Sequence, residues 1–147
     1  MLRKAAKTVS SRYPFGADDF LQQVIGGVLL TAPFIFTEEV WTIAANMSDV
    51  QSSIMVAASL LIGHGVLYIA HQERDWDTER KLIGVTYRYI SLMAVAFGTV
   101  TTLILVTGAD QTLGGSALQT VSVVALVSPF AVVGAATADS LIQGIDS

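Results

Sequence analysis

The chain has no cysteine, only two histidines and few charged residues, and each of these shortages excludes a class of protein. Without cysteine there are no disulfides, no thiolate metal ligands and no cysteine nucleophile. Two histidines make only a weak metal-binding signal, so we expect neither a metal nor a cofactor. The net charge of −4, with no basic patch interleaved with aromatics, argues against nucleic-acid binding.

Charged residues make up 14% of the 147 residues and hydrophobic residues 52%. Average soluble proteins carry about 25% charged residues. The apolar residues also gather in long runs between short charged clusters. A soluble domain of this length needs more polar residues to cover its surface. We therefore expect a single transmembrane domain, residues 1–147, with the lipid bilayer as its main partner.

The long apolar runs set the expected fold class. A helix needs about 20 mostly apolar residues to cross a hydrocarbon core of about 30 Å. The runs that meet this length are residues 20–40, 53–71, 82–107 and 117–138. The sequence thus predicts an all-α polytopic membrane bundle with about four transmembrane helices. The first run is too long, and is followed by too many others, to be a cleaved signal peptide.

The basic residues predict the orientation. Each of the 8 lysines and arginines precedes the first expected span, lies in the second connection or falls at the start of the third span. Basic residues favour the cytoplasmic side of a membrane. We therefore expect a multi-pass protein of the cell membrane with both termini cytoplasmic. Aromatic residues fit belts at the two interfaces. The inner belt would contain Tyr13, Trp76, Tyr87 and Tyr89, and the outer belt Trp41.

The run Thr37-Glu38-Glu39 is the first candidate site, near the outer end of the first span. It follows Pro33, which removes a backbone hydrogen bond and should kink the helix. Two adjacent carboxylates could bind a monovalent or divalent cation, or a proton if one of them is held neutral. In a symmetric oligomer, one glutamate per subunit would form an acidic ring. The alternative interpretation is a helix end whose acids face water.

His64, flanked by two glycines in the second span, is the second candidate. Helical spacing places it on one stripe with Tyr68. The other members of that stripe are Ser53, Ala57, Leu60 and His71. A polar stripe inside a membrane should face the bundle or a wet cavity, where His64 could relay protons. We favour the alternative, in which His64 hydrogen-bonds a neighbouring helix and the glycines permit close packing.

Arg88 and Asp139 fall at similar depth in the third and fourth spans, so we expect a structural ion pair. Pro129 is a second expected kink, in a Ser-Pro-Phe run that echoes the Ala-Pro-Phe run at Pro33. Small residues in the first and last spans predict close helix packing. They are Gly26, Gly27, Gly134, Ala135 and Ala136.

The segment from Pro33 to Trp41 resembles a motif of an uncharacterised prokaryotic integral membrane family, domain of unknown function 2391. The family pattern is a proline, three residues, then Thr-x-Glu-x-Trp. It is filled here by Pro33, Thr37, Glu39 and Trp41. The resemblance singles out Glu39 rather than Glu38 and implies no substrate. Family members are often longer, with more spans, so this chain resembles a compact version.

The sequence contains no nucleophile elbow, P-loop, zincin motif or dinucleotide fingerprint, so we expect no enzymatic activity. A few short spans enclose little room, so a pathway would need several copies of the chain. We expect a homo-oligomeric cation channel or an ion or small-solute transporter. Its acidic site would lie at the outer end of the first span. The alternative is a non-transport accessory or scaffold subunit of the membrane.

Overall fold

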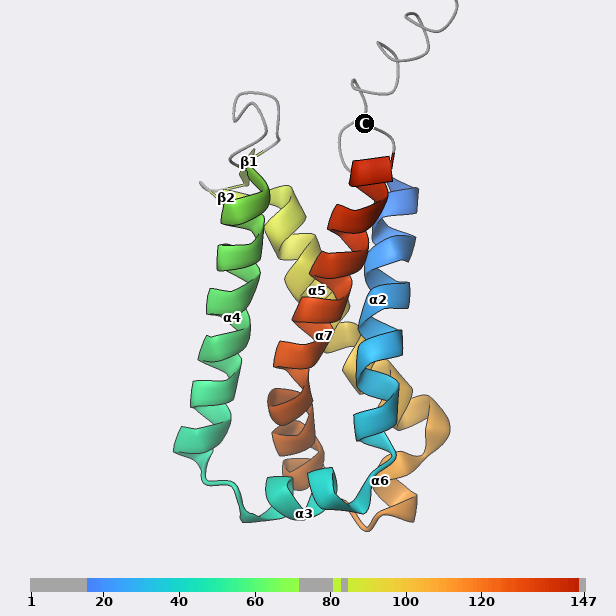
Figure 1. Ribbon diagram of the computed structural model, residues 1–147. Helices are drawn as coiled ribbons and strands as arrows, with labels where there is room; N and C mark the ends of the chain where they lie inside the picture. The colour runs from blue at the N-terminus through green and yellow to red at the C-terminus, as the bar shows by residue number, and fades with distance from the viewer. Residues whose placement is uncertain (1–15, 72–80, 83–84, 146–147) are drawn as a thin grey trace, which may run out of the picture.

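The computed structural model describes residues 16–71, 81–82 and 85–145, and these form a bundle of long helices (Figure 1). The long helices run between two opposite ends of the molecule. They are α2 (Ala17–Ile35), α4 (Asp49–His71), α5 (Tyr87–Thr107) and α7 (Ala117–Ile145). The predicted helical membrane bundle is therefore confirmed.

Short elements lie at the two ends of the bundle (Figure 1). At the α3 end, α3 (Glu38–Asn46) joins α2 to α4, and α6 (Ala109–Thr112) joins α5 to α7. At the hairpin end, β1 (Lys81–Leu82) pairs antiparallel with β2 (Val85–Thr86) before α5 begins. Tyr13, Trp76 and the basic residues other than Lys81 and Arg88 lie outside the described residues.

The helices match the expected spans unequally. By length and composition, α4, α5 and α7 can each cross a bilayer, whereas α2 qualifies only together with α3, from which it is bent by 82°. The first expected span, residues 20–40, is thus not one straight helix, because α2 ends at Ile35. The third expected span begins late, at Tyr87, because the residues before it form strands.

α2 and α7 pack backbone to backbone. A Cβ on Gly26 would collide with the carbonyl oxygen of Gly134, and a Cβ on Gly134 would collide with that of Gly26. Farther along the same pair, the rings of Phe34 and Phe130 stack with centroids 4.8 Å apart. Small residues let membrane helices approach this closely, because lipid offers little competing attraction. The predicted close-packing role of Gly26 and Gly134 is confirmed.

The two prolines have different effects. Pro33 lies in the last turn of α2, which stops soon after it. Pro129 lies inside α7, which continues as one helix to Ile145. Next to it, the Ser128 hydroxyl donates a hydrogen bond to the Val124 carbonyl. Ser and Thr side chains, and packing against neighbouring helices, make proline tolerable inside a membrane helix.

Large apolar side chains cover the outside of the bundle. In a soluble protein such a surface would mark an interface, but around a membrane bundle it meets lipid. Among the most exposed are Leu29, Leu61, Ile69, Val106 and Leu118. The interior is largely apolar as well, and its main polar group lies near the hairpin end.

Candidate functional site

The α2–α3 corner is closed by hydrogen bonds to the last carbonyls of α2. Thr37 donates its backbone N–H (3.2 Å) and its hydroxyl (2.9 Å) to the Phe34 carbonyl. The Trp41 indole Nε1–H donates to the Ile35 carbonyl at 2.8 Å. Carbonyls in the last turn of a helix lack intrahelical partners. Thr37 and Trp41 supply those partners and so hold the turn between the two helices.

Trp41 also ties the corner to α7. Its side chain is 1% exposed, and its carbonyl accepts a hydrogen bond from Gln119 Nε2 at 3.0 Å. Gly115 lies so close to the indole ring that a Cβ there would collide with it. The placement of Trp41 in an outer aromatic belt is therefore wrong. A belt residue keeps its ring among the headgroups, whereas this ring fills the core at the corner.

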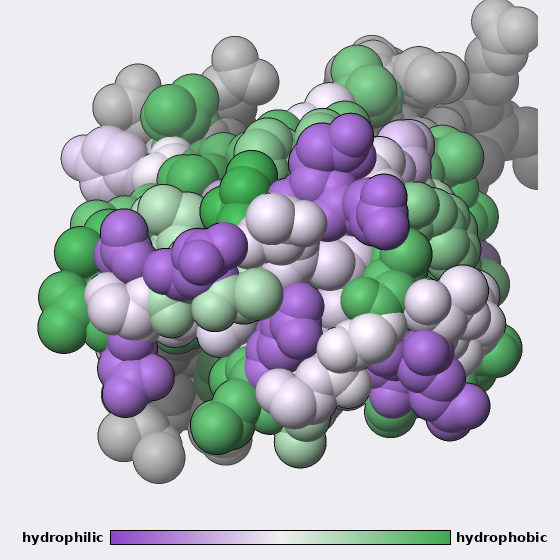
Figure 2. Space-filling view, turned by 90° about the horizontal axis from the view of Figure 1, so that it is seen from below, coloured by the Kyte–Doolittle hydropathy of each residue, from purple (hydrophilic) through white to green (hydrophobic). Residues whose placement is uncertain are grey.

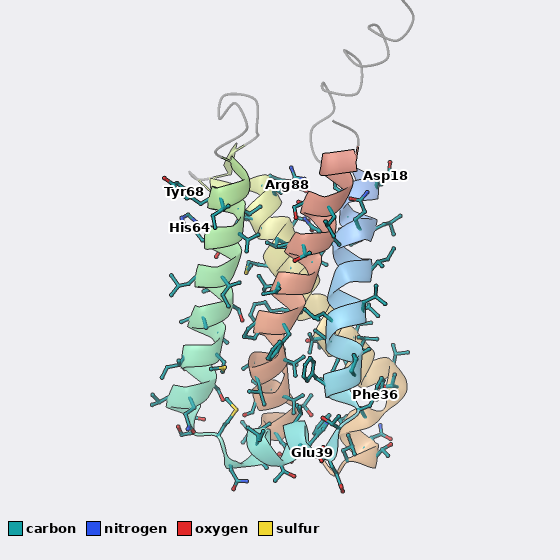
Figure 3. The ribbon with its side chains drawn as sticks, viewed as in Figure 1. Asp18, Phe36, Glu39, His64, Tyr68 and Arg88 are labelled. Carbon is teal, nitrogen blue, oxygen red and sulfur yellow. The ribbon has the colours of Figure 1, made fainter. Side chains whose placement is uncertain are left out.

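Glu38 and Glu39 lie in the first turn of α3, and both are exposed. Figure 3 labels Glu39 at this end of the bundle. Acids are favoured in the first turn because the helix N-terminus carries partial positive charge. The break after Ile35 moves both carboxylates out of α2 and onto a helix that lies across the end of the bundle. The candidate acidic site is therefore a surface feature of the α3 end.

The surface of the α3 end carries several hydrophilic patches among neutral and hydrophobic residues (Figure 2). Its acidic residues are Glu38, Glu39, Asp49 and Asp110. No lysine or arginine occurs between residues 13 and 73 or after residue 88. The negative charge of this end is therefore not compensated by basic side chains of the same end.

The His64 stripe of α4 faces away from the bundle. His64 and Tyr68 both project outward (Figure 3), and Tyr68 is 53% exposed. The stripe members Ser53, Ala57 and Leu60 are exposed too. The side chain of His71 lies outside the described part of the chain.

In the single chain most of this stripe is exposed, because α4 packs through a neighbouring face about a quarter turn away. The expected wet cavity stays a prediction. The packed face includes Ser59, Gly63 and Leu67, and a Cβ on Gly63 would collide with Met93 of α5. Gly63 thus permits close packing, as expected, whereas a Cβ on Gly65 would meet nothing within 4 Å. The His64 ring meets the Tyr89 ring edge-on, with centroids 6.2 Å apart.

Arg88 and Asp139 form a two-pronged ion pair. Arg88 Nε donates to Asp139 Oδ2 and Nη2 donates to Oδ1, each at 2.8 Å. Both side chains are buried, at 8% and 7% exposed. Parallel hydrogen bonds of this kind fit the planar guanidinium and are among the strongest in proteins. The structure therefore brings together Arg88 and Asp139, whose similar depth in the third and fourth expected spans predicted the pair.

Asp19 of α2 is the third member of this charged group. Its Oδ1 lies 3.9 Å from Arg88 Nη2. Its Oδ2 accepts the backbone N–H of Gly16 at 3.0 Å, which closes the start of α2. One guanidinium thus lies between carboxylates of two different helices, and the group has one carboxylate more than it has guanidinium groups.

Gln23 extends the group one turn deeper between α2 and α5. It is 0% exposed, and its Oε1 accepts a hydrogen bond from Ser91 Oγ at 3.2 Å. Gln23 Nε2 and Gln22 Oε1 are buried, and neither has a hydrogen-bond partner in the described part of the chain. We call Asp19, Gln23, Arg88, Ser91 and Asp139 the polar cluster.

Sequence reasoning did not find Asp19 or Gln23, although a signal was present. The two residues are four apart, so they share a helix face. Gly26 and Gly27 continue that face and are buried. A face that carries both polar residues and close-packing glycines is turned toward other helices, not toward lipid.

No group of three or more histidine or acidic side chains within the described ranges could hold a metal ion. The charged residues of the described part lie mainly in two places. They are the polar cluster near the hairpin end and the acids of the α3 end, of which Glu38 and Glu39 are exposed.

Apolar helices long enough to span a bilayer, enclosing a buried ion pair, define a polytopic helical membrane protein. The chain belongs to the family described as "Putative integral membrane protein (DUF2391)", whose model matches residues 3–142. The resemblance carried by Pro33, Thr37, Glu39 and Trp41 is thereby confirmed. No curated protein and no solved structure matches the chain.

Proposed function

We propose that the protein is an oligomeric cation channel or an ion or small-solute transporter of the cell membrane. Both termini are cytoplasmic in this proposal, and the α3 end faces outside. One observation carries it: Glu38 and Glu39 are exposed together at an end of the molecule whose described residues include no lysine or arginine. We assign Glu39 to the entrance of the cation pathway, because Glu39 is the acid of the family motif.

The electrostatics of the α3 end favour cations. Uncompensated carboxylates raise the local concentration of cations and lower that of anions. At physiological ionic strength charges are screened over about 8 Å, so only acids close to the pathway matter. Rings of acidic side chains select cations in known channels. Repeating Glu39 around an axis in an oligomer would make such a ring.

A pathway between copies of the chain fits the packing better than one through a single copy. The interior between α5 and α7 is filled by apolar side chains that are almost completely buried. They include Val100, Ile104, Val123 and Val127. The outward polar face of α4, with His64 and Tyr68, would then meet a neighbouring copy instead of lipid. Intramembrane polar residues usually do face other protein or water.

Flux in liposomes tests the proposal. Purified protein is reconstituted and assayed with K⁺, Na⁺, Ca²⁺ and H⁺ in turn. We expect a selective flux that Glu39→Gln abolishes while the variant still folds and inserts. Asp49→Asn is the matched control, because Asp49 is also an exposed acid of the α3 end but lies outside the corner. Flux that is unchanged in Glu39→Gln would remove the acidic entrance.

The alternative, a non-transport accessory or scaffold subunit, is favoured by the corner itself. Thr37 and Trp41 bind carbonyls of α2, so two of the motif positions have a structural task. Absence of flux for every ion, from protein shown to be folded, would select this alternative. Cross-linking through the outward face of α4 would then identify the partner. Neither proposal assigns a catalytic activity to the chain.

A further inference from the structure

We propose that the polar cluster binds one alkali cation in the seam between α2 and α5 near the hairpin end. This inference concerns binding alone, and it stands whether or not the protein transports anything. It assigns a ligand to residues that lie away from the acidic corner of the α3 end.

The first argument is charge. Asp139 is fully engaged by the two hydrogen bonds from Arg88, each 2.8 Å long. Asp19 Oδ1 is 3.9 Å from the same guanidinium, which is beyond hydrogen-bond distance. A carboxylate next to a guanidinium that already has a closer partner is only partly compensated. The remaining negative charge of Asp19 attracts a second cation.

The second argument is the pair of buried glutamine atoms. Buried polar atoms in proteins almost always have partners. Gln22 Oε1 is a buried acceptor without a partner in the described part of the chain, one turn from Asp19. Gln23 is 0% exposed, and its Nε2 is likewise without a described partner.

The Gln23 amide can also present an oxygen to the cation. A half turn about its last bond exchanges Oε1 and Nε2. The Ser91 hydroxyl can either donate or accept, so its hydrogen bond survives the exchange. Carboxylate and amide oxygens on adjacent turns of α2 would then surround the ion.

The third argument concerns the size of the charge. Among described side chains, the ionisable groups near this level are Asp18 and Asp19 on α2, His64 and Tyr68 on α4, Tyr87, Arg88 and Tyr89 on α5, and Asp139 on α7 (Figure 3). Asp18 and Tyr87 are exposed at the surface. A single surplus carboxylate suits a single positive charge. Calcium sites use six to eight oxygens, commonly with several carboxylates. The side chain of Asp19 is 27% exposed, which leaves a small ion access from the hairpin end.

Thermal unfolding of the full-length protein in detergent tests the inference. Na⁺, K⁺ or Li⁺ replaces choline at constant ionic strength and constant pH. A cation that binds only the folded state raises Tm as its concentration increases. A rise with an alkali ion identifies that ion as the ligand.

Two variants of neighbouring residues make the comparison specific. Asp19→Asn removes the charge, but its amide oxygen can still accept the Gly16 N–H. Asp18→Asn removes an equal charge from the exposed neighbouring residue. We expect the cation-dependent rise in Tm to vanish in Asp19→Asn and to persist in Asp18→Asn. If Asp19→Asn does not fold, Gln23→Met replaces it, because this variant leaves every charge in place. We then expect the cation-dependent rise in Tm to vanish in Gln23→Met and to persist in Asp18→Asn.

Two results would overturn the inference. One is a wild-type Tm that does not respond to any alkali ion. The other is an equal loss of the response in Asp18→Asn and Asp19→Asn. A chain that binds a cation here but supports no flux in liposomes keeps this inference and removes the proposed transport function.

Discussion

Arg88 holds Asp139 of α7 by two hydrogen bonds of 2.8 Å while its Nη2 lies 3.9 Å from Asp19 of α2. Three helices that are distant in sequence therefore meet at one side chain at the hairpin end. The same three helices are packed through apolar side chains farther toward the α3 end. The ion pair thus fixes how the ends of these helices meet, a task that apolar contacts perform less specifically.

Arg88→Met should destabilise the protein strongly. Removing the guanidinium leaves Asp139 buried without a partner, and breaking a buried pair in this way costs about 3–5 kcal/mol. Unfolding in detergent by heat or denaturant measures the change. The double variant Arg88→Met with Asp139→Leu should recover most of the loss, because no buried charge remains. If the double variant is as unstable as the single one, the charge itself is not what matters.

Gly134→Ala should destabilise the contact of α2 with α7. The new methyl group would collide with the Gly26 carbonyl, and overpacking of this kind costs about 1–3 kcal/mol. Gly98→Ala is the matched control, because Gly98 is also in a helix but a Cβ there meets nothing within 4 Å. It should be neutral or stabilising by up to about 1 kcal/mol, because alanine is the better helix former. Equal Tm values for the two variants would contradict the backbone contact.

Trp41→Phe should loosen the α2–α3 corner. Phenylalanine keeps an aromatic ring but leaves a small void, and the Ile35 carbonyl loses the indole N–H, whose nitrogen lies 2.8 Å away. An unsatisfied buried acceptor costs about 1–3 kcal/mol. Phe36→Leu, at an exposed position of the same corner, should have a much smaller effect. Unfolding in detergent compares the two variants, and similar losses would show that the indole bond is not specific.

Burial of Trp41 has a separate optical test. In a Trp76→Phe background the remaining tryptophan fluorescence comes from Trp41 alone. Because the Trp41 side chain is 1% exposed, we expect weak quenching by acrylamide. Quenching as strong as that of free tryptophan would contradict the packing of the corner.

Single cysteines test the orientation, and the natural chain has no cysteine to interfere. Asp49→Cys and Gln111→Cys place a thiol at exposed sites of the α3 end, and Asp18→Cys places one at an exposed site of the hairpin end. With a membrane-impermeant maleimide on intact cells, we expect labelling of the first two. Asp18→Cys should react only after the membrane is opened. The reverse pattern would place the α3 end inside.

The parts of the fold that depend on local composition could be predicted. Long apolar runs predicted α4, α5 and α7, and matching depth in two runs predicted the pairing of Arg88 with Asp139. The break after Ile35 could not be placed in the same way. Pro33 predicts a kink, but the 82° bend also depends on the packing of Trp41 against Gly115, which is distant from it in the sequence. Such a contact exists only after α7 has docked.

The candidate sites were harder to predict than the spans. In a membrane helix both the lipid-facing and the packed face are mainly apolar, so the pattern of apolar residues does not show which face packs. The His64 stripe was expected to point inward, but in α4 no strong amphipathic pattern shows which face packs. Gly63, which approaches Met93, decides the question through shape, not polarity. In α2 the decisive feature was also glycine, since Gly26 marks the face that carries Gln23 into the interior.

The backbone contact between Gly26 and Gly134 limits how the molecule can change shape. Two helices whose backbones touch cannot slide along each other without first separating, because no flexible side chain lies between them to give way. α2 and α7 should therefore move as one rigid unit. α4 is less enclosed, since 17% of the residues in its apolar stretch are buried, against 50% in α7. Any conformational cycle of this chain should consist of α4 swinging against a stationary α2–α7 pair.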